Sequence, residues 1–332
     1  MATHLVTGAA GFIGHRLCEQ LLASGHRVVG VDNLNAYYDP QLKRDRLATL
    51  QQHVSFEFIK VELSDAEEVA KLFNANQYES VFHMAAQPGV RYSLEDPQAY
   101  VSSNLVAFSH ILEGCRHHGA PHLIYASSSS VYGGNTKVPF SVDDPVDHPM
   151  SLYAATKRSN ELTATAYAQL YDLPITGLRF FTVYGPWGRP DMAIYKFAEA
   201  MQAGRPIQVY NFGRMRRDFT YIDDIVDGIL QAAEAFYNRP EETRNKHRLY
   251  NLGNNTSVEL GHLIAVLEHE LGVVAEKQML PMQPGDVPLT YADIEKSRNE
   301  LGFQPKTSIE EGVQRFVAWK RSYEARRKVA AI

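Results

Sequence analysis

Short apolar runs alternate with amphipathic stretches along the first 180 residues of the chain. Between the runs, apolar residues such as Leu17, Leu21 and Leu22 recur every three to four positions, which predicts helices with one buried face. Strands alternating with helices are typical of a parallel sheet covered on both faces. We therefore expect an α/β protein with a doubly wound, Rossmann-type parallel sheet. Its strands are predicted at 4–7, 27–31, 56–61, 80–83, 122–127 and 176–181.

The pattern changes after these strands, where proline and glycine cluster at 185–190 and a helix is predicted at 191–203. We expect residues 1–180 to form the sheet-based, dinucleotide-binding domain. Residues 181–332 are expected to form a smaller C-terminal lobe that binds a substrate. The apolar run at 249–252 predicts a strand that returns to the main sheet, so the boundary between the two parts is not a clean one.

Composition describes an ordinary globular chain of 332 residues with a formal net charge of −5. This charge gives no general attraction for nucleic acid or anionic lipid, so an anionic ligand must be bound by a few local cations. No apolar run approaches the roughly 18 residues of a membrane span. Two cysteines and no leader-like segment before His4 favour a cytoplasmic location. The histidines at 117, 118 and 122 are close in sequence, but they lie across a predicted helix end and a predicted strand start, so no metal site is expected.

A glycine-rich turn joins the first strand to the first helix. Gly8 permits the tight turn, Gly11 lets the backbone approach a pyrophosphate, and Gly14 allows helix and strand to pack closely. The helix N-terminus offers unpaired N–H groups and a positive dipole end to the diphosphate. Asp32 ends the second strand, where a carboxylate can accept hydrogen bonds from the adenosine ribose and would repel a 2′-phosphate. The sequence therefore predicts NAD rather than NADP.

A tyrosine and a lysine stand four residues apart in a predicted helix, so Tyr153 and Lys157 share one helix face. An unperturbed tyrosine has a pKa of about 10, and a neighbouring cation stabilises the phenolate so that it can act as a base near neutral pH. Ser128 lies at the carboxyl end of an apolar strand, where open α/β sheets place their ligands. Tyr153 and Lys157 therefore form the predicted catalytic pair, and Ser128 is a candidate ligand-binding hydroxyl.

Five blocks of sequence, together with GxxGxxG spacing in the glycine turn, resemble the UDP-glucuronate 4-epimerase family of the extended short-chain dehydrogenase/reductase superfamily. The blocks lie at 35–40, 87–93, 126–133, 179–192 and 217–224, so they spread over nearly the whole chain. The resemblance implies NAD as cofactor, and it implies that Ser128 is the catalytic hydroxyl partner of Tyr153. Glu62 and Leu63 stand where the family usually has an Asp-Leu pair at the adenine. The other implied cofactor contacts, besides the glycines and Asp32, are Phe12, Ile13, Asn33, Ala85, Ala86, Asn104, Tyr153 and Lys157.

The resemblance also implies how a UDP-sugar is bound. In the family, an arginine at the position of Arg217 grips the diphosphate, and an acid at the position of Asp286 accepts a hydrogen bond from the uridine ribose. Arg189 and Arg91 are the candidate cations for a carboxylate on the sugar, because a guanidinium suits a planar carboxylate. For both arginines an ordinary structural ion pair is the alternative interpretation.

The serine cluster bears on the type of reaction. Similar dehydratases and decarboxylases carry an acidic residue just before a VYG-like triplet, whereas Ser129 and Ser130 stand there in this chain. Galactose-type relatives usually have asparagine at the position of Thr182, and a short hydroxyl leaves room for a sugar carboxylate. The predicted substrate-binding hydroxyls are therefore those of Thr182 and of Ser128, Ser129 and Ser130. The predicted reaction is reversible C4 epimerisation of UDP-glucuronate to UDP-galacturonate through a transient 4-keto sugar.

Three alternatives remain open at this point: a 4-epimerase of another UDP-hexose or its N-acetyl form, a UDP-glucuronate decarboxylase or dehydratase, and a dinucleotide-sensing module without catalysis. Intact Tyr153, Lys157 and Ser128 argue against the last. The predicted helices at 100–115 and 152–171 have broad apolar faces. In similar proteins these two helices form a dimer contact, so a homodimer is expected.

Overall fold

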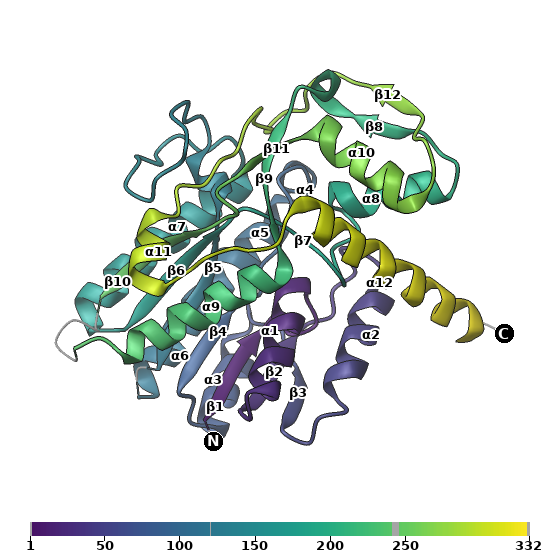
Figure 1. The fold of residues 1–332 in the computed structure, drawn as a ribbon. Coiled ribbons are helices and arrows are strands. Elements are labelled where there is room, and N and C mark those ends of the chain that lie inside the picture. The colour runs from purple at the N-terminus through teal and green to yellow at the C-terminus, as the bar shows by residue number, and fades with distance from the viewer. Residues whose placement is uncertain (1, 120, 241–245, 331–332) are drawn as a thin grey trace.

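Seven parallel strands form the main sheet of the structure, a computed structural model that describes residues 2–119, 121–240 and 246–330. Their order is β3-β2-β1-β4-β5-β6-β10, which confirms the predicted doubly wound sheet (Figure 1). The order reverses between β1 and β4, and open α/β sheets bind ligands at such a point. The strands are β1 (Thr3–Thr7), β2 (Arg27–Asp32), β3 (Phe56–Lys60), β4 (Ser80–His83), β5 (His122–Ser128), β6 (Ile175–Phe180) and β10 (His247–Leu252).

Helices cover both faces of this sheet, and each face has its own hydrophobic core. Leu5 and Val6 are neighbours on β1 with no exposed surface, yet they belong to different cores, because successive side chains of a strand point to opposite faces. One core includes α1 (Phe12–Ala23) and α9 (Ile222–Tyr237). The other includes α3 (Ala66–Ala75), α6 (Ala107–His117) and α7 (Leu152–Tyr171).

The helix predicted at 100–115 is divided in the structure. It consists of the end of α5 (Pro97–Tyr100), a π-helical turn η1 (Val101–Val106) and α6. A π turn widens the backbone and is common at functional sites. Farther along the chain, the helix predicted at 191–203 is α8 (Ala193–Gln202), and it begins later because Met192 is extended.

The smaller lobe is drawn in green above the main sheet in Figure 1. It contains a three-stranded sheet, ordered β11-β9-β7, and a two-stranded sheet of β12 and β8. The chain enters the lobe after β6 and returns to the main sheet at β10. This strand pairs with β6 from His247 to Leu252, a range that includes the predicted strand at 249–252. The elements are β7 (Thr182–Tyr184), α8, β8 (Ile207–Val209), η3 (Tyr210–Gly213), β9 (Arg216–Tyr221), β11 (Ser257–Glu259), α10 (Leu260–Leu271) and β12 (Lys277–Met279).

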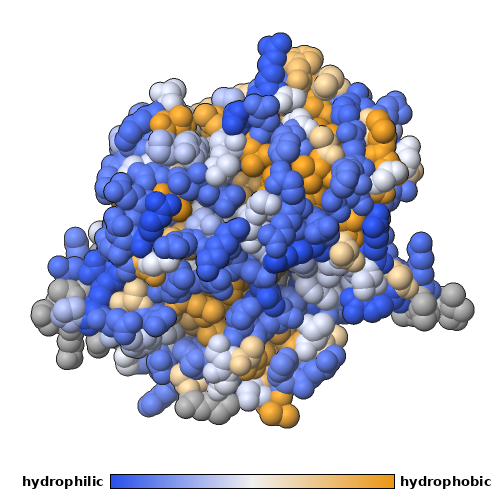
Figure 2. All heavy atoms as spheres, in the orientation of Figure 1, coloured by the Kyte–Doolittle hydropathy of each residue, from blue (hydrophilic) through white to orange (hydrophobic). Residues whose placement is uncertain are grey.

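The remaining elements connect the two parts. The last helix, α12 (Ile309–Ala330), runs from the lobe down to α2 (Pro40–Leu50), where the hydroxyl of Tyr323 donates to Asp45 at 2.6 Å (Figure 1). Shorter helices are α4 (Tyr92–Glu95), η2 (Ser129–Tyr132) and α11 (Glu295–Leu301). Hydrophilic side chains cover most of the face seen in Figure 2, and orange areas are most evident in its upper part, over the lobe. None of the helices, within the described ranges, combines the length and apolar character that crossing a membrane requires.

Candidate active site

A cavity of about 1090 Å³ lies between the carboxyl ends of the main strands and the lobe. It begins at the glycine turn after β1, passes Tyr153 of α7, and reaches Arg217 of β9 and Asp286. Nearly all of the predicted site residues line this one space. Asn104 is the exception: its side chain binds both backbone groups of Gln87 and the hydroxyl of Thr156, so it joins the segment after β4 to α7 instead of facing the cavity.

The glycine turn is shaped to receive a dinucleotide. Gly8 has φ +70°, and a Cβ there would lie 2.8 Å from the backbone nitrogen of Ala85. At Gly14 a Cβ would lie 2.1 Å from the Gly8 carbonyl oxygen, so any side chain would push helix and turn apart. Gly11 is the extended N-cap of α1 and makes no side-chain capping bond. The first turn of α1 therefore keeps its N–H groups for a diphosphate, and these residues fit NAD.

Asp32 is positioned for a ribose by hydrogen bonds from two backbone amides. Its carboxylate accepts from the amide of Ala10 at 3.2 Å and from that of Leu34 at 2.8 Å. Lys43 of α2 lies 3.9 Å from the same carboxylate and donates to Asn35 at 2.8 Å. The carboxylate is thus fixed at the tip of β2, at the edge of the cavity, as an acceptor for ribose hydroxyls.

The adenine end of the cavity is polar on one side and apolar on the other. Glu62 accepts from the Asn33 amide at 2.8 Å and from the backbone and hydroxyl of Ser64 at 3.1 and 3.0 Å. Burial raises the pKa of Glu62, but these hydrogen bonds outweigh it, and the net direction is down. The carboxylate is therefore already bound to protein groups. Phe12, Ile13, Leu63, Ala85 and Ala86 add apolar surface to the same end.

Tyr153 and Lys157 lie on the inner face of α7, as their spacing predicts. The Lys157 ammonium is buried and donates to the carbonyl oxygen of Ala126 at 2.9 Å. Burial lowers the pKa of Lys157 to about 8, against the opposing influence of Glu161. The Tyr153 ring packs edge-on against Tyr100, with centroids 6.0 Å apart.

The electrostatics of Tyr153 involve a cation for which the sequence did not predict this role. Burial raises the pKa of Tyr153, while the Ser128 hydroxyl and the positive charge of Arg189 lower it. Arg189 is thus a further cation beside Tyr153, and the role expected of Lys157, whose ammonium donates to the carbonyl of Ala126, stays a prediction. Spacing along a helix shows which residues share a face, but it cannot reveal a cation that arrives from a loop after β7.

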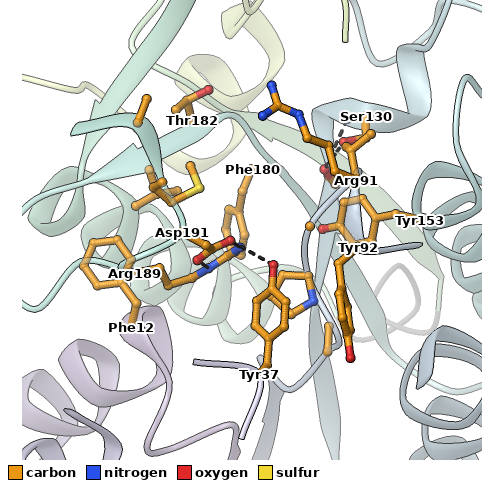
Figure 3. A pocket seen from close by; sticks show the side chains of 18 of the residues that line it. Phe12, Tyr37, Arg91, Tyr92, Ser130, Tyr153, Phe180, Thr182, Arg189 and Asp191 are labelled. Carbon is orange, nitrogen blue, oxygen red and sulfur yellow. Dashed lines mark hydrogen bonds and ion pairs between the residues drawn. The ribbon is translucent and has the colours of Figure 1, made fainter. Parts of the chain in front are cut away.

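The serine cluster at the end of β5 has two separate tasks. Ser127 donates to Glu161 at 2.7 Å, and Glu161 forms a buried ion pair with Arg179, so this serine belongs to the structural core. Ser128 accepts from the amide of Ser130 at 3.1 Å, and its hydroxyl donates to that of Ser130 at 3.0 Å. The hydroxyls of Ser128 and Ser130 therefore face the cavity as a linked pair, with Thr182 on the other side in Figure 3.

Arg189 is one of the two candidate cations, and it lies in a network that the sequence did not reveal. Its guanidinium binds Asp191 through two nitrogens, one of them at 3.0 Å, and the Tyr37 hydroxyl donates to the same carboxylate at 3.1 Å (Figure 3). Tyr37 and Asp191 both line the cavity. Both lie inside blocks that carry the family resemblance, and that was the only available signal for them.

Arg91 and Arg217 lie at the far end of the cavity and differ in their partners. Arg91 pairs with Asp286 at 2.9 Å and stacks over the ring of Tyr210, 4.5 Å from its centroid. Arg217 donates to the carbonyl of Arg216 at 3.0 Å, and no ion pair joins it to a carboxylate among the residues that the structure describes. Burial lowers the pKa of Arg217, as does the charge of Arg91, while Asp286 raises it. Two guanidiniums and one carboxylate thus lie at this end of the cavity, which leaves excess positive charge for an anion.

The three histidines noted in the sequence point to different partners. His117 contacts Glu113 at 3.1 Å, His118 contacts Asn74 at 2.9 Å, and His122 is buried against Thr176 at 2.9 Å. In the described part of the chain, no three histidine, cysteine or acidic side chains gather as metal ligands do.

A glycine turn, an acid at the tip of β2 and a tyrosine–lysine helix around one cavity define a dinucleotide-binding enzyme of the short-chain dehydrogenase/reductase type. Comparison with known proteins narrows this class. Residues 4–253 match the NAD dependent epimerase/dehydratase family, and the chain belongs to that family.

Relatives extend over the whole chain. It is 53% identical over 330 residues to an uncharacterized 37.6 kDa protein of Escherichia coli O111:H-, covering 96% of this chain and 98% of that one. It is 47% identical over 327 residues to a probable UDP-glucuronate 4-epimerase of Rhizobium meliloti, covering 95% and 96%. The crystal structure of a UDP-glucuronic acid 4-epimerase from Bacillus cereus, in complex with UDP-glucuronic acid and NAD, matches with a TM-score of 0.89 and 34% identity, covering 97% and 99%.

Proposed function

We propose that this protein is an NAD-dependent isomerase that interconverts UDP-glucuronate and UDP-galacturonate by epimerisation at C4. The observation that carries the proposal is that Tyr153, the glycine turn and the guanidinium of Arg217, which has no ion pair among the described residues, open into one cavity. A cofactor, a proton-transfer group and a diphosphate site are the parts that this reaction needs. Relatives that are named UDP-glucuronate 4-epimerases, one of them solved with UDP-glucuronic acid and NAD, support the same activity.

The cofactor would be held mainly by the first two strands. The α1 N-terminus and Gly11 would receive the diphosphate, Asp32 the adenosine ribose, and Glu62 with Asn33 the adenine side. Lys157 would hold the nicotinamide ribose. Bound NAD supplies reversible hydride transfer at C4 of the sugar.

Tyr153 is the proposed acid–base group. Its phenolate would take the proton from the C4 hydroxyl as the ketone forms, and the phenol would return that proton when the ketone is reduced. Ser128 would donate to the same oxygen, and Arg189 would stabilise the phenolate by its charge. The sugar must turn over between the two steps while UDP stays bound, so that reduction occurs on the opposite face.

UDP would be bound at the end of the cavity where positive charge is in excess. Arg217 would bind the diphosphate, with Arg91 beside it, and Asp286 would accept from the uridine ribose. Because Asp286 already pairs with Arg91 at 2.9 Å, a diphosphate that attracts Arg91 would free the carboxylate for the ribose.

The sugar carboxylate would lie among short hydroxyls. Thr182 and the cluster of Ser128, Ser129 and Ser130 can donate to it, and Arg189, which lines the same cavity, is the proposed cation. The 4-keto intermediate is a β-keto acid, which readily loses carbon dioxide. These donors must therefore hold the carboxylate where its bond to C5 is poorly aligned for cleavage.

The deciding experiment is incubation of purified protein with UDP-glucuronate, without added cofactor, followed by NMR. UDP-galacturonate is the expected product. A UDP-pentose with carbon dioxide would indicate a decarboxylase, and turnover of UDP-glucose or N-acetyl sugars alone would indicate a different 4-epimerase. Unchanged UDP-glucuronate with NAD bound would leave the binding-module alternative.

We also propose that the enzyme is cytoplasmic and forms a homodimer. Cys18 and Cys115 are buried and free, which suits a reducing compartment. Leu162 and Leu170 lie two turns apart on α7 and are 56% and 70% exposed, so they give this helix an apolar outer face that a second copy would cover. Light scattering of the wild type and of Leu162→Glu tests this, because a monomeric wild type would refute the dimer.

A further inference from the structure

Arg46 of α2 is fully buried, and its guanidinium has no carboxylate partner among the described residues. One terminal nitrogen donates to the carbonyl of Ala10 at 2.9 Å and to the Tyr38 hydroxyl at 2.7 Å. The other donates to the carbonyl of Trp187 at 2.6 Å. A buried charge is costly unless its hydrogen bonds are specific, and these bonds reach three separate segments of the chain.

The first of these segments is the glycine turn of the proposed cofactor site. Ala10 is fixed on both sides, since its amide donates to Asp32 at 3.2 Å and its carbonyl accepts from Arg46. A movement of Arg46 would therefore move the peptide that lies between the diphosphate and ribose positions.

The second segment is the loop that carries Arg189. Trp187 has φ +62°, an unusual conformation for a residue with a large side chain, and its carbonyl is the one that Arg46 holds. Its ring lies 5.5 Å from that of His15 and 5.3 Å from those of Trp319 and Tyr323. Trp187 is thus held in a strained conformation by contacts with residues outside the lining of the cavity.

The third segment links the other two. Tyr37 and Tyr38 are neighbours in the loop after β2, and they join Arg46 to the loop that carries Arg189. Tyr38 accepts from Arg46, and Tyr37 donates to Asp191. The glycine turn, the loop with Tyr37 and Tyr38, and the loop that carries Arg189 therefore form one hydrogen-bonded unit with Arg46 at its centre.

We propose that Arg46 is a positioning residue. It fixes the loop that carries Trp187 and Arg189 relative to the glycine turn, and so places Arg189 beside Tyr153. It touches neither end of the cavity with its own side chain. Its action passes through the peptide carbonyls of Ala10 and Trp187. A dinucleotide seated on the turn would therefore help to order the loop that serves the sugar, and the loop in turn would help to retain the dinucleotide.

The test compares Arg46→Met and Arg46→Lys with Arg44→Met, an exposed position on the same helix. The chain has two tryptophans, Trp187 and Trp319, whose rings lie in contact. In a Trp319→Phe background, the tryptophan fluorescence emission therefore comes from Trp187 alone. In Arg46→Met we expect altered emission, easier loss of bound NAD, and kcat lower by about 10- to 100-fold, because small misplacements near a reacting centre cost that much. UDP binding should change by less than about 2-fold, because Arg217 and Asp286 take no part in this unit.

Arg46→Lys keeps the charge but cannot span both carbonyls, and it should give values between those of the wild type and Arg46→Met. Unchanged emission, NAD retention and kcat in a folded Arg46→Met would overturn the proposal. Equal fold-losses in UDP affinity and in kcat would also overturn it, because they would indicate a general disturbance of the fold. If Arg46→Met fails to fold, Tyr38→Phe removes one acceptor of the guanidinium, and wild-type emission and NAD retention there would count against the proposal.

The kcat comparison rests on the proposed epimerase activity, whereas emission and NAD retention do not. If the wild type leaves UDP-glucuronate unchanged, the proposed function fails, but the emission and NAD measurements still decide the role of Arg46.

Discussion

The two ends of the cavity are built on different principles. At the cofactor end, the glycine turn and Asp32 come from one strand–helix–strand unit and are fixed by bonds among themselves. At the UDP end, Arg91, Arg217 and Asp286 come from three distant segments, and the one carboxylate pairs with Arg91 and not with Arg217. The groups of the first end are already held by hydrogen bonds within the protein. The second end carries unbalanced positive charge, and an anionic ligand would relieve it.

Tyr153 lies between these ends, and its loss should have the largest effect. Tyr153→Phe removes the proposed proton acceptor and should lower kcat by about 10²- to 10⁴-fold, the usual contribution of acid–base catalysis. Bound NAD and the affinity for UDP should stay at wild-type values, because neither end uses the phenol. Tyr171→Phe, on an outer part of the same helix, is the control for loss of a hydroxyl. Wild-type turnover in Tyr153→Phe would remove the proposed mechanism.

Arg217→Met should separate the UDP end from the cofactor end. Hydrogen bonds to charged groups contribute about 1.5–3 kcal/mol each, so KM for the UDP-sugar should rise by about 10- to 100-fold. Retained NAD should not change. Arg214→Met, at an exposed neighbouring position, serves as the control. Loss of NAD together with the rise in KM would show that the two ends are not independent.

Acidification should weaken the sheet that carries the cofactor end. Burial lowers the pKa of His83 to about 3, with a smaller contribution from Lys157, and the imidazole is hydrogen-bonded to Thr7 at 2.9 Å. In the unfolded chain a histidine has a pKa of about 6.5. Between pH ~3 and pH ~6.5, His83 is therefore protonated in the unfolded chain and neutral in the folded protein. Stability conferred by neutral His83 is therefore present above pH ~6.5 and is lost as the pH falls, by about 1.4 kcal/mol per pH unit.

His83→Asn should flatten this dependence in urea unfolding measured from pH 7 to pH 5. His53→Asn, at an exposed position, should leave the slope unchanged. Equal slopes for the wild type and His83→Asn would contradict the assignment of a neutral, buried imidazole.

The difference between the two ends also decides what the sequence could predict. The doubly wound sheet and the cofactor end follow from local patterns, since turn, helix N-terminus and Asp32 are neighbours in one unit, whereas the order of the strands was learned from the structure. The contacts of Arg189 could not be deduced, because its partners Asp191 and Tyr37 meet only in the folded chain. The influence of Arg189 on Tyr153 could not be deduced either, because the loop that brings this arginine has no periodic signal.

Thr182→Val should have the smallest effect, and it tests how the UDP end extends to the sugar. Removing one hydroxyl deprives the proposed carboxylate site of a donor while Ser128 and Ser130 remain, so epimerisation should slow by only about 3- to 10-fold. The carboxylate of the 4-keto intermediate should then be less restrained, and the share of UDP-pentose and carbon dioxide in the product should rise. Thr182→Ser keeps the hydroxyl and should behave as the wild type does. If Thr182→Val changes neither the rate nor the by-product, Thr182 does not restrain the carboxylate, and that role falls to the serines and Arg189.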